Sequence, residues 1–72
     1  MNPEYNNKEF VESIIGQRKH FSLGCIGIEF TGVVEGYSEC CNEFILKIKE
    51  DRGFYRYLGM NSPNLSIIDQ ED

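Results

Sequence analysis

Residues 27–46 alternate between apolar and polar side chains, which leaves little choice of secondary structure. A period of two is the mark of a β-strand with one buried face. The members of the apolar parity are Ile28, Phe30, Gly32 and Val34. A glycine on that parity, Gly32, permits a sharp bend or the close approach of another backbone. After a short polar loop the alternation resumes at Phe44, Leu46 and Ile48, so the stretch predicts two strands joined in a bent hairpin that begins to close a small sheet.

The rest of the chain predicts one helix and three more strands around this hairpin. An apolar stripe at helical spacing (Phe10, Val11, Ile14 and Ile15) predicts an amphipathic helix of about three turns, capped by Asn6 or Asn7 and ended by Gly16. Strands are expected at 17–25, 53–60 and 65–68. The charged loop 49–53 is expected to be a solvated hairpin tip in which Gly53 supplies a positive φ, and 61–64 is expected to be a turn.

This order predicts a mainly β fold, a small five-stranded, strongly bent antiparallel barrel with an N-terminal α-helix. The 72 residues are expected to form a single domain, 1–72, with a loose N-terminus at 1–7 and an acidic tail at 69–72. A chain this short has a small core and often gains stability by association.

Charge and composition narrow the classes of function. Twelve acidic residues against seven basic ones give a net charge of −5. A protein that binds nucleic acids through general electrostatic attraction is basic, so DNA binding is not expected. A local basic rim or a pocket for a single strand remains possible at this net charge. No apolar run approaches about 20 residues and no signal peptide is visible, so an intracellular protein without membrane contact is expected. Cys25, Cys40 and Cys41 are odd in number and lack ligand spacing, so they are expected to be reduced thiols that serve as small apolar filler.

The hairpin and the turn after the 53–60 strand resemble the two sequence motifs of Sm and Sm-like (LSm) proteins. The first motif is matched without a gap by Gly27, Phe30, Gly32, Val34, Tyr37, Asn42, Phe44 and Ile45. Ser38 stands where the family has Asp, and Cys41 where it usually has Met. The second motif is matched in spacing by 60–65 and Ile68, but Asn61 and Ser62 replace its Arg-Gly pair. The resemblance covers roughly residues 7–69 and implies the LSm fold.

The resemblance also implies a site for RNA. In the family, the loop Asn and the Arg of the second motif hold a flipped-out base, usually uracil, and an aromatic residue stacks on it. The candidate RNA-binding residues by this correspondence are Ser38, Cys40, Asn42, Asn61 and Ser62. Cys40 offers no stacking face and Asn61 no guanidinium, so the usual pocket is partly represented. Asn42 is interpreted either as an RNA contact or as a loop residue whose amide bonds its own backbone.

Association is the second property that the resemblance implies. In LSm rings the fourth strand of one subunit pairs with the fifth strand of the next, and those strands are expected here at 54–60 and 65–68. The candidate interface residues are Phe54, Tyr55, Tyr57, Leu65 and Ile67. Their apolar character fits an edge that a neighbour covers, or alternatively residues that fill and cover a monomeric barrel.

No constellation of residues indicates an enzyme, a metal site or a cofactor. The expected function is therefore that of an Sm-like subunit of a ring or other oligomer, cytoplasmic or nuclear, which acts in RNA metabolism. Its expected partners are other Sm-like subunits and single-stranded uridine-rich RNA. Two alternatives stay open: an assembly subunit without RNA affinity, like the Gemin-type subunits of the SMN complex, and an unrelated SH3-like interaction barrel.

Overall fold

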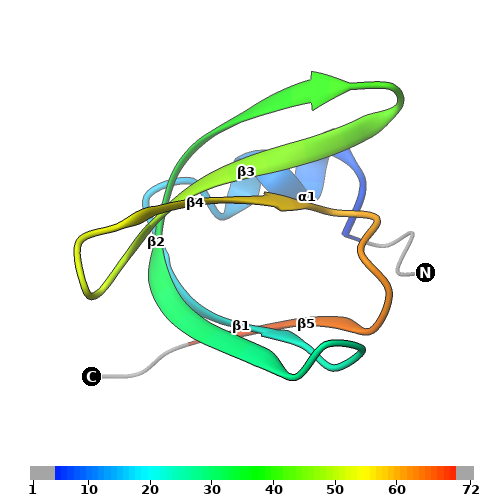
Figure 1. The fold of residues 1–72 in the computed structure, drawn as a ribbon. Coiled ribbons are helices and arrows are strands. Elements are labelled where there is room, and N and C mark those ends of the chain that lie inside the picture. Colours follow the sequence, from blue (N-terminus) through cyan, green and yellow to red (C-terminus); the bar gives the residue numbers. More distant parts are fainter. Residues whose placement is uncertain (1–4, 70–72) are drawn as a thin grey trace.

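The protein was analysed as a computed structural model that describes residues 5–69. Within this range the chain forms one helix and then five strands, as expected from the sequence (Figure 1). Their bounds are α1 (Lys8–Ser13), β1 (Arg18–Leu23), β2 (Ile28–Cys40), β3 (Glu43–Glu50), β4 (Tyr55–Gly59) and β5 (Leu65–Asp69). All pairings are antiparallel and give a single sheet of order β4-β3-β2-β1-β5.

The segments expected to be loose fall partly outside the described residues, namely at 1–4 and 70–72. The remaining residues of those segments make defined contacts. The Asn6 side-chain amide donates to the backbone oxygen of Asn42 (3.0 Å), and its carbonyl oxygen accepts from the backbone N–H of Phe44 (2.8 Å). Asp69 belongs to β5 and forms an ion pair with Lys19.

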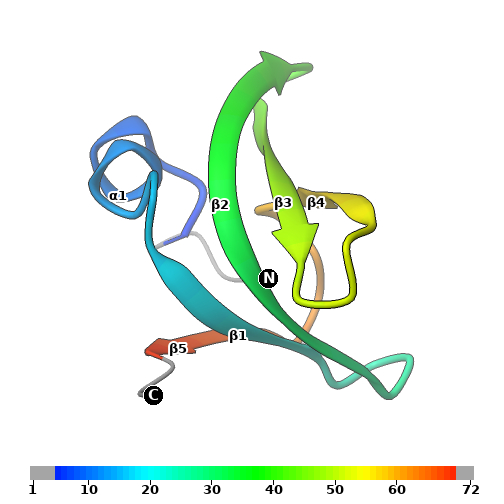
Figure 2. The same ribbon diagram turned by 90° about the vertical axis from the view of Figure 1, so that its left-hand side faces the viewer.

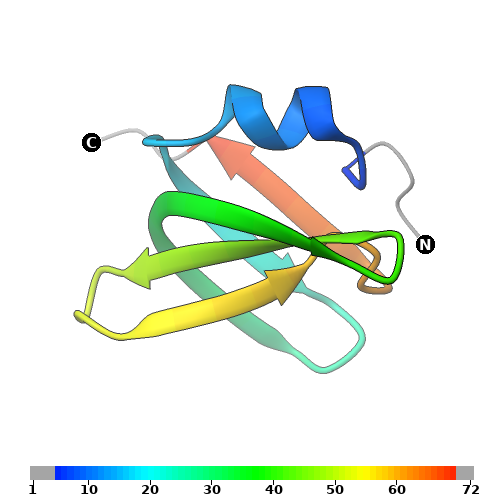
Figure 3. The ribbon, with the colours of Figure 1, turned by 90° about the horizontal axis from the view of Figure 1, so that it is seen from above.

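Helix α1 is shorter than the three turns that its apolar stripe predicted. Asn7 caps it, because its side-chain oxygen accepts from the backbone N–H of Phe10 (2.7 Å). The helix ends after Ser13, and the positive φ of Gly16 (85°) then turns the chain toward β1. Val11 and Ile14 are buried in the core, and Figure 3 shows the helix on the side of the sheet where β5 ends.

Strand β2 is a long arc that connects the two halves of the sheet (Figure 2). It pairs with β1 along its first half and with β3 along most of its length, and the register shifts between Val34 and Gly36 at a bulge. A Cβ built on Gly32 would lie 2.9 Å from the Cα of Glu50 and against the carbonyl oxygen of Lys49. The expected close approach of another backbone at Gly32 is therefore confirmed.

The core fills the space inside the bend. Its members come from every element of the fold: Val11, Ile14, Phe21, Leu23, Phe30, Val34, Leu46, Ile48, Leu58, Met60 and Leu65. The stacked rings of Phe21 and Phe30, with centroids 5.1 Å apart, join β1 to β2. Alternate residues of the strands face outward, as their period of two predicted.

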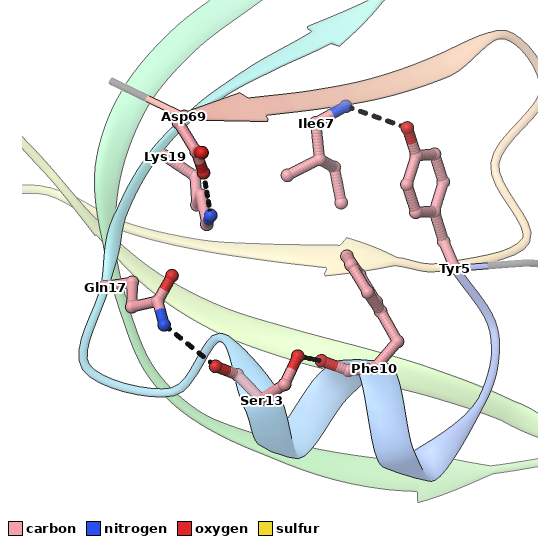
Figure 4. Close-up of polar contacts among 7 residues, drawn as sticks. All are labelled: Tyr5, Phe10, Ser13, Gln17, Lys19, Ile67 and Asp69. Carbon is pink, nitrogen blue, oxygen red and sulfur yellow. Dashed lines mark hydrogen bonds and ion pairs between the residues drawn. The ribbon is translucent and has the colours of Figure 1, made fainter. Parts of the chain in front are cut away.

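The expectation of a barrel is met only in part, because the sheet is not closed. Within residues 5–69, β4 and β5 do not pair with each other and stand at opposite ends of the strand order. The ring of Tyr5 lies beside β5, and its hydroxyl accepts from the backbone N–H of Ile67 (3.3 Å, Figure 4). That backbone group is thus occupied by the N-terminal segment rather than by β4, and the fold is a strongly bent open sheet.

The prediction that the cysteines are apolar filler is wrong, because all three are exposed. Cys25 lies in the turn between β1 and β2, and Cys40 and Cys41 lie at the tip of the β2–β3 hairpin, beyond the core. The hairpin turn consists of Cys41 and Asn42, with φ of 57° and 65°. Across residues 5–69, no helix has the length and apolar character needed to cross a membrane.

Candidate assembly edges and loop site

The outer edge of β4 carries backbone groups that point away from the sheet. The backbone oxygen of Phe54 accepts from Glu50, and the N–H of Met60 donates to Phe44, so the even-numbered residues of this segment are directed toward β3. By the alternation of an antiparallel ladder, the backbone groups of Tyr55 and Tyr57 are directed away from it. No strand of the described chain pairs with this edge, which makes it a template for another strand.

The side chains of the β4 segment are also open to solvent. Phe54 is 63% exposed, Tyr55 51% and Tyr57 67%, although all three are large and apolar in most of their surface. Leu58 and Met60, in contrast, belong to the core. Exposed aromatic residues along an unpaired edge are typical of a surface that a partner covers.

The β5 side chains that the sequence predicted to lie at an interface are directed toward the core instead. Leu65 is buried in the core and Ile67 packs against the core, so neither offers its side chain to a partner. Ile68, which was not among the predicted interface residues, is 56% exposed. The sequence could have predicted this exposure, because Ile67 and Ile68 are consecutive strand residues and one of the two must face outward.

Two predicted RNA-contact residues, Asn42 and Asn61, lie on neighbouring loops at one end of the sheet. The carboxylate of Glu43, next to Asn42 in the chain, accepts from the backbone N–H of Asn61 (2.9 Å) and so ties the β2–β3 turn to the turn after β4. Both asparagines are exposed. The structure therefore places the loops of the two asparagines that the motif comparison selected next to each other, with the carboxylate of Glu43 between the loops.

The other predicted RNA-contact residues have different surroundings. The Ser62 hydroxyl donates to the backbone oxygen of Gly59 (2.7 Å) and shapes the turn. Cys40 ends β2, and its Sγ lies 3.5 Å from the Sγ of Cys41. Ser38 is exposed opposite Ile45 and lines a groove on the outer face of the sheet rather than the loop end.

The β3–β4 hairpin holds an ion-pair cluster, and the prediction of a fully solvated tip is wrong for Glu50. This residue is 5% exposed, and its carboxylate accepts from Nε of Arg56 (2.5 Å) and Nη2 of Arg52 (3.3 Å). The hydrogen bond from Arg56 holds the pKa of Glu50 below its ordinary value, against the opposing effect of burial. The Arg56 guanidinium also covers the ring of Phe30, at 4.4 Å from its centroid. This cluster stabilises the hairpin.

Residues 5–69 contain no group of three or more His, Cys, Asp or Glu side chains that could hold a metal ion. Comparisons with models of protein families, with curated proteins and with solved structures found no match to this chain. The assignment of a function consequently rests on the geometry of the edges, the loops and the outer face.

Proposed function

We propose that this protein is an Sm-like subunit that assembles by pairing β4 of one copy with β5 of the next, and that it acts in RNA metabolism inside the cell. The observation that carries the proposal is the identity of the edge strands. In LSm rings, to which the sequence motifs are similar, the fourth and fifth strands pair between subunits. In this chain β4 and β5 are the ends of the described strand order.

The side chains at these edges support the proposal. Tyr55 and Tyr57 on β4 and Ile68 on β5 are exposed beyond what a small monomeric fold requires. Pairing between copies would supply backbone partners for β4 and cover part of these side chains. The strongly bent β2 and the order of the strands agree with an Sm-like fold.

The residues of the two loops favour weak or no binding of RNA at the place where LSm proteins hold a base. Asn42 and Asn61 lie on neighbouring loops, which supports an RNA-contact role, but Glu43 introduces a carboxylate and Cys40 gives no stacking face. Phosphate groups are repelled by a nearby carboxylate. The second candidate function is therefore an assembly subunit without RNA affinity at these loops.

The experiment that tests assembly compares two matched substitutions at exposed isoleucines. Ile68→Asp places a charge on the β5 edge, whereas Ile26→Asp places one in the turn before β2, where the side chain is 62% exposed. We expect native mass spectrometry to show an oligomer for the wild type and for Ile26→Asp, and its loss for Ile68→Asp. A wild-type chain that stays monomeric at every concentration tested would contradict self-assembly.

A second measurement separates the RNA role from assembly. Titration of oligouridine into the wild type and into Asn42→Gly/Asn61→Ala reports whether the loop amides contact RNA, since glycine tolerates the positive φ of position 42. Lower affinity in the double variant, with the oligomer intact, supports the loop site. An oligomer that binds no RNA would favour the assembly role alone.

A further inference from the structure

The outer face of the β3–β4 hairpin places two lysines directly opposite two tyrosines. In the ladder, Lys47 is the partner of Tyr57 and Lys49 is the partner of Tyr55. Both ammonium groups lie near the same ring, with Nζ of Lys47 4.6 Å and Nζ of Lys49 5.9 Å from the Tyr55 centroid. Two positive charges thus lie beside one aromatic ring on the outer face of an acidic protein.

These lysines differ from most of the other basic side chains of the chain. Arg18, Lys19, Arg52 and Arg56 form ion pairs with Asp51, Asp69 and Glu50. Among residues 5–69, no carboxylate forms an ion pair with Lys47 or Lys49. An anion bound at this place would supply the counter-charge that these two ammonium groups lack.

A groove of about 250 Å³ adjoins Lys47 on the same face. It is lined by Gly36, Tyr37, Ser38, Ile45, Lys47 and Tyr57. Gly36 lies at the β2 bulge, and a Cβ built on it would meet no atom within 4 Å, so the missing side chain leaves the groove open. Tyr57 stands at its side with 67% of its surface exposed.

From this arrangement we propose that the outer face of β2, β3 and β4 binds single-stranded nucleic acid. Lys47 and Lys49 contact phosphates, and the Tyr57 ring provides a platform on which a base stacks at the groove. An aromatic platform beside cations that form no ion pair is the combination that single-strand binders use, whereas an acidic peptide would leave the stacking surface without a role.

The proposal deepens the RNA role proposed above and moves the contact surface from the loops to the sheet face. The face can bind with or without assembly, because edge pairing extends a sheet within its plane and would cover the side chains of β4 only in part. Lys47 and Lys49 lie on β3, an interior strand of the described sheet, so substitutions there leave the edges unchanged.

The test measures fluorescence anisotropy of a labelled oligouridine against salt concentration. For Lys47→Gln/Lys49→Gln we expect weaker binding and a salt slope smaller in magnitude by about 1.4, since each phosphate contact on a single strand contributes about 0.7. Lys8→Gln, an exposed lysine on α1, is the control and should leave the affinity near that of the wild type. Tyr57→Leu should weaken binding roughly 5- to 150-fold, and Tyr57→Phe should retain it.

A further variant and a second ligand complete the test. Gly36→Leu should fill the groove and weaken binding, since the position has space and no positive φ. Heparin, a polyanion without bases, should compete poorly. If heparin binds as well as oligouridine and Tyr57→Leu has no effect, the face is a general anion surface and the proposal is overturned. Loss of binding in Asn42→Gly/Asn61→Ala but not in the face variants would also overturn it, and would support the loop site of the proposed function instead.

Discussion

Gly32 determines how closely β2 and β3 approach each other. Its position on the buried parity would normally carry an apolar side chain. Here the backbone of β3 occupies that volume, with the Cα of Glu50 and the Cγ2 of Ile48 within 2.9 Å of any added Cβ. The bend of β2 thus depends on one absent methyl group.

We expect Gly32→Ala to lower the free energy of unfolding by about 1–3 kcal/mol or more, because backbone atoms would have to move to make room. Gly36→Ala is the matched control four residues away. Its added methyl group meets open space, so the change should be neutral or stabilise by up to about 1 kcal/mol. Urea unfolding of both variants checks this. Equal stabilities would show that the strand spacing at Gly32 adapts without cost.

Strand β5 is an edge that the chain itself covers in part. The Tyr5 hydroxyl accepts from the N–H of Ile67, and the Tyr5 ring packs on Phe10 with centroids 5.2 Å apart (Figure 4). Natural sheets commonly protect their edges in this manner against indiscriminate pairing. A partner strand would have to replace this side-chain bond by a backbone bond.

Removal of the hydroxyl should therefore favour assembly. For Tyr5→Phe we expect the concentration at which the oligomer forms to fall roughly two- to tenfold, which corresponds to a net hydrogen bond of about 0.5–1.5 kcal/mol. Tyr37→Phe is the control, because it removes the hydrogen bond from the Tyr37 hydroxyl to Glu12, which lies away from the edges. It should leave the concentration at which the oligomer forms unchanged. Analytical ultracentrifugation measures both. Weaker assembly in Tyr5→Phe would mean that the hydroxyl supports the partner strand.

The sequence predicted the regular elements well, because periodicity is a local property that each strand carries by itself. The buried positions of Phe30 and Val34 and the close approach at Gly32 could be predicted in this way. The prediction is wrong for Ile28, which has the same parity but is 36% exposed at the start of β2. The surroundings of Glu50 could not, since its partner Arg56 lies across a hairpin turn. The same holds for the cysteines, whose exposure depends on how far the β2–β3 tip projects beyond the core. That Asn42 and Asn61 lie on neighbouring loops could be expected only from the motif resemblance.

The protein has a net charge of −5, so the ion pairs that its few basic side chains form with carboxylates matter for its stability. Arg18, Arg52 and Arg56 hold Asp51 and Glu50 around the β3–β4 hairpin. Hydrogen bonds from Arg18 and Arg56 lower the pKa of Asp51 and of Glu50, respectively, relative to their ordinary values. Since the folded pKa lies below the unfolded one, each group stabilises the fold above the unfolded pKa, and this contribution is lost as the pH falls through the folded pKa.

Thermal unfolding should therefore show a melting temperature that declines as the pH falls below 4.5, the ordinary pKa of a Glu side chain. We expect Glu50→Gln to have a lower melting temperature at neutral pH and a shallower decline in acid, because one of the titrating groups is gone. Glu35→Gln replaces an exposed carboxylate on β2 and serves as the control. A decline as steep in Glu50→Gln as in the wild type would place the acid sensitivity elsewhere.

The bend in β2 also sets how copies would be arranged if β4 of one pairs with β5 of the next. Such an interface is head-to-tail, so each added copy is rotated relative to the previous one by the angle between the two edges. That angle is fixed within a single chain, largely by the curvature at Gly32 and at the bulge near Gly36. A rotation that divides a full circle gives a closed ring of definite copy number, and any other rotation gives an open helical filament. The curvature of β2 would then determine the number of subunits in the ring.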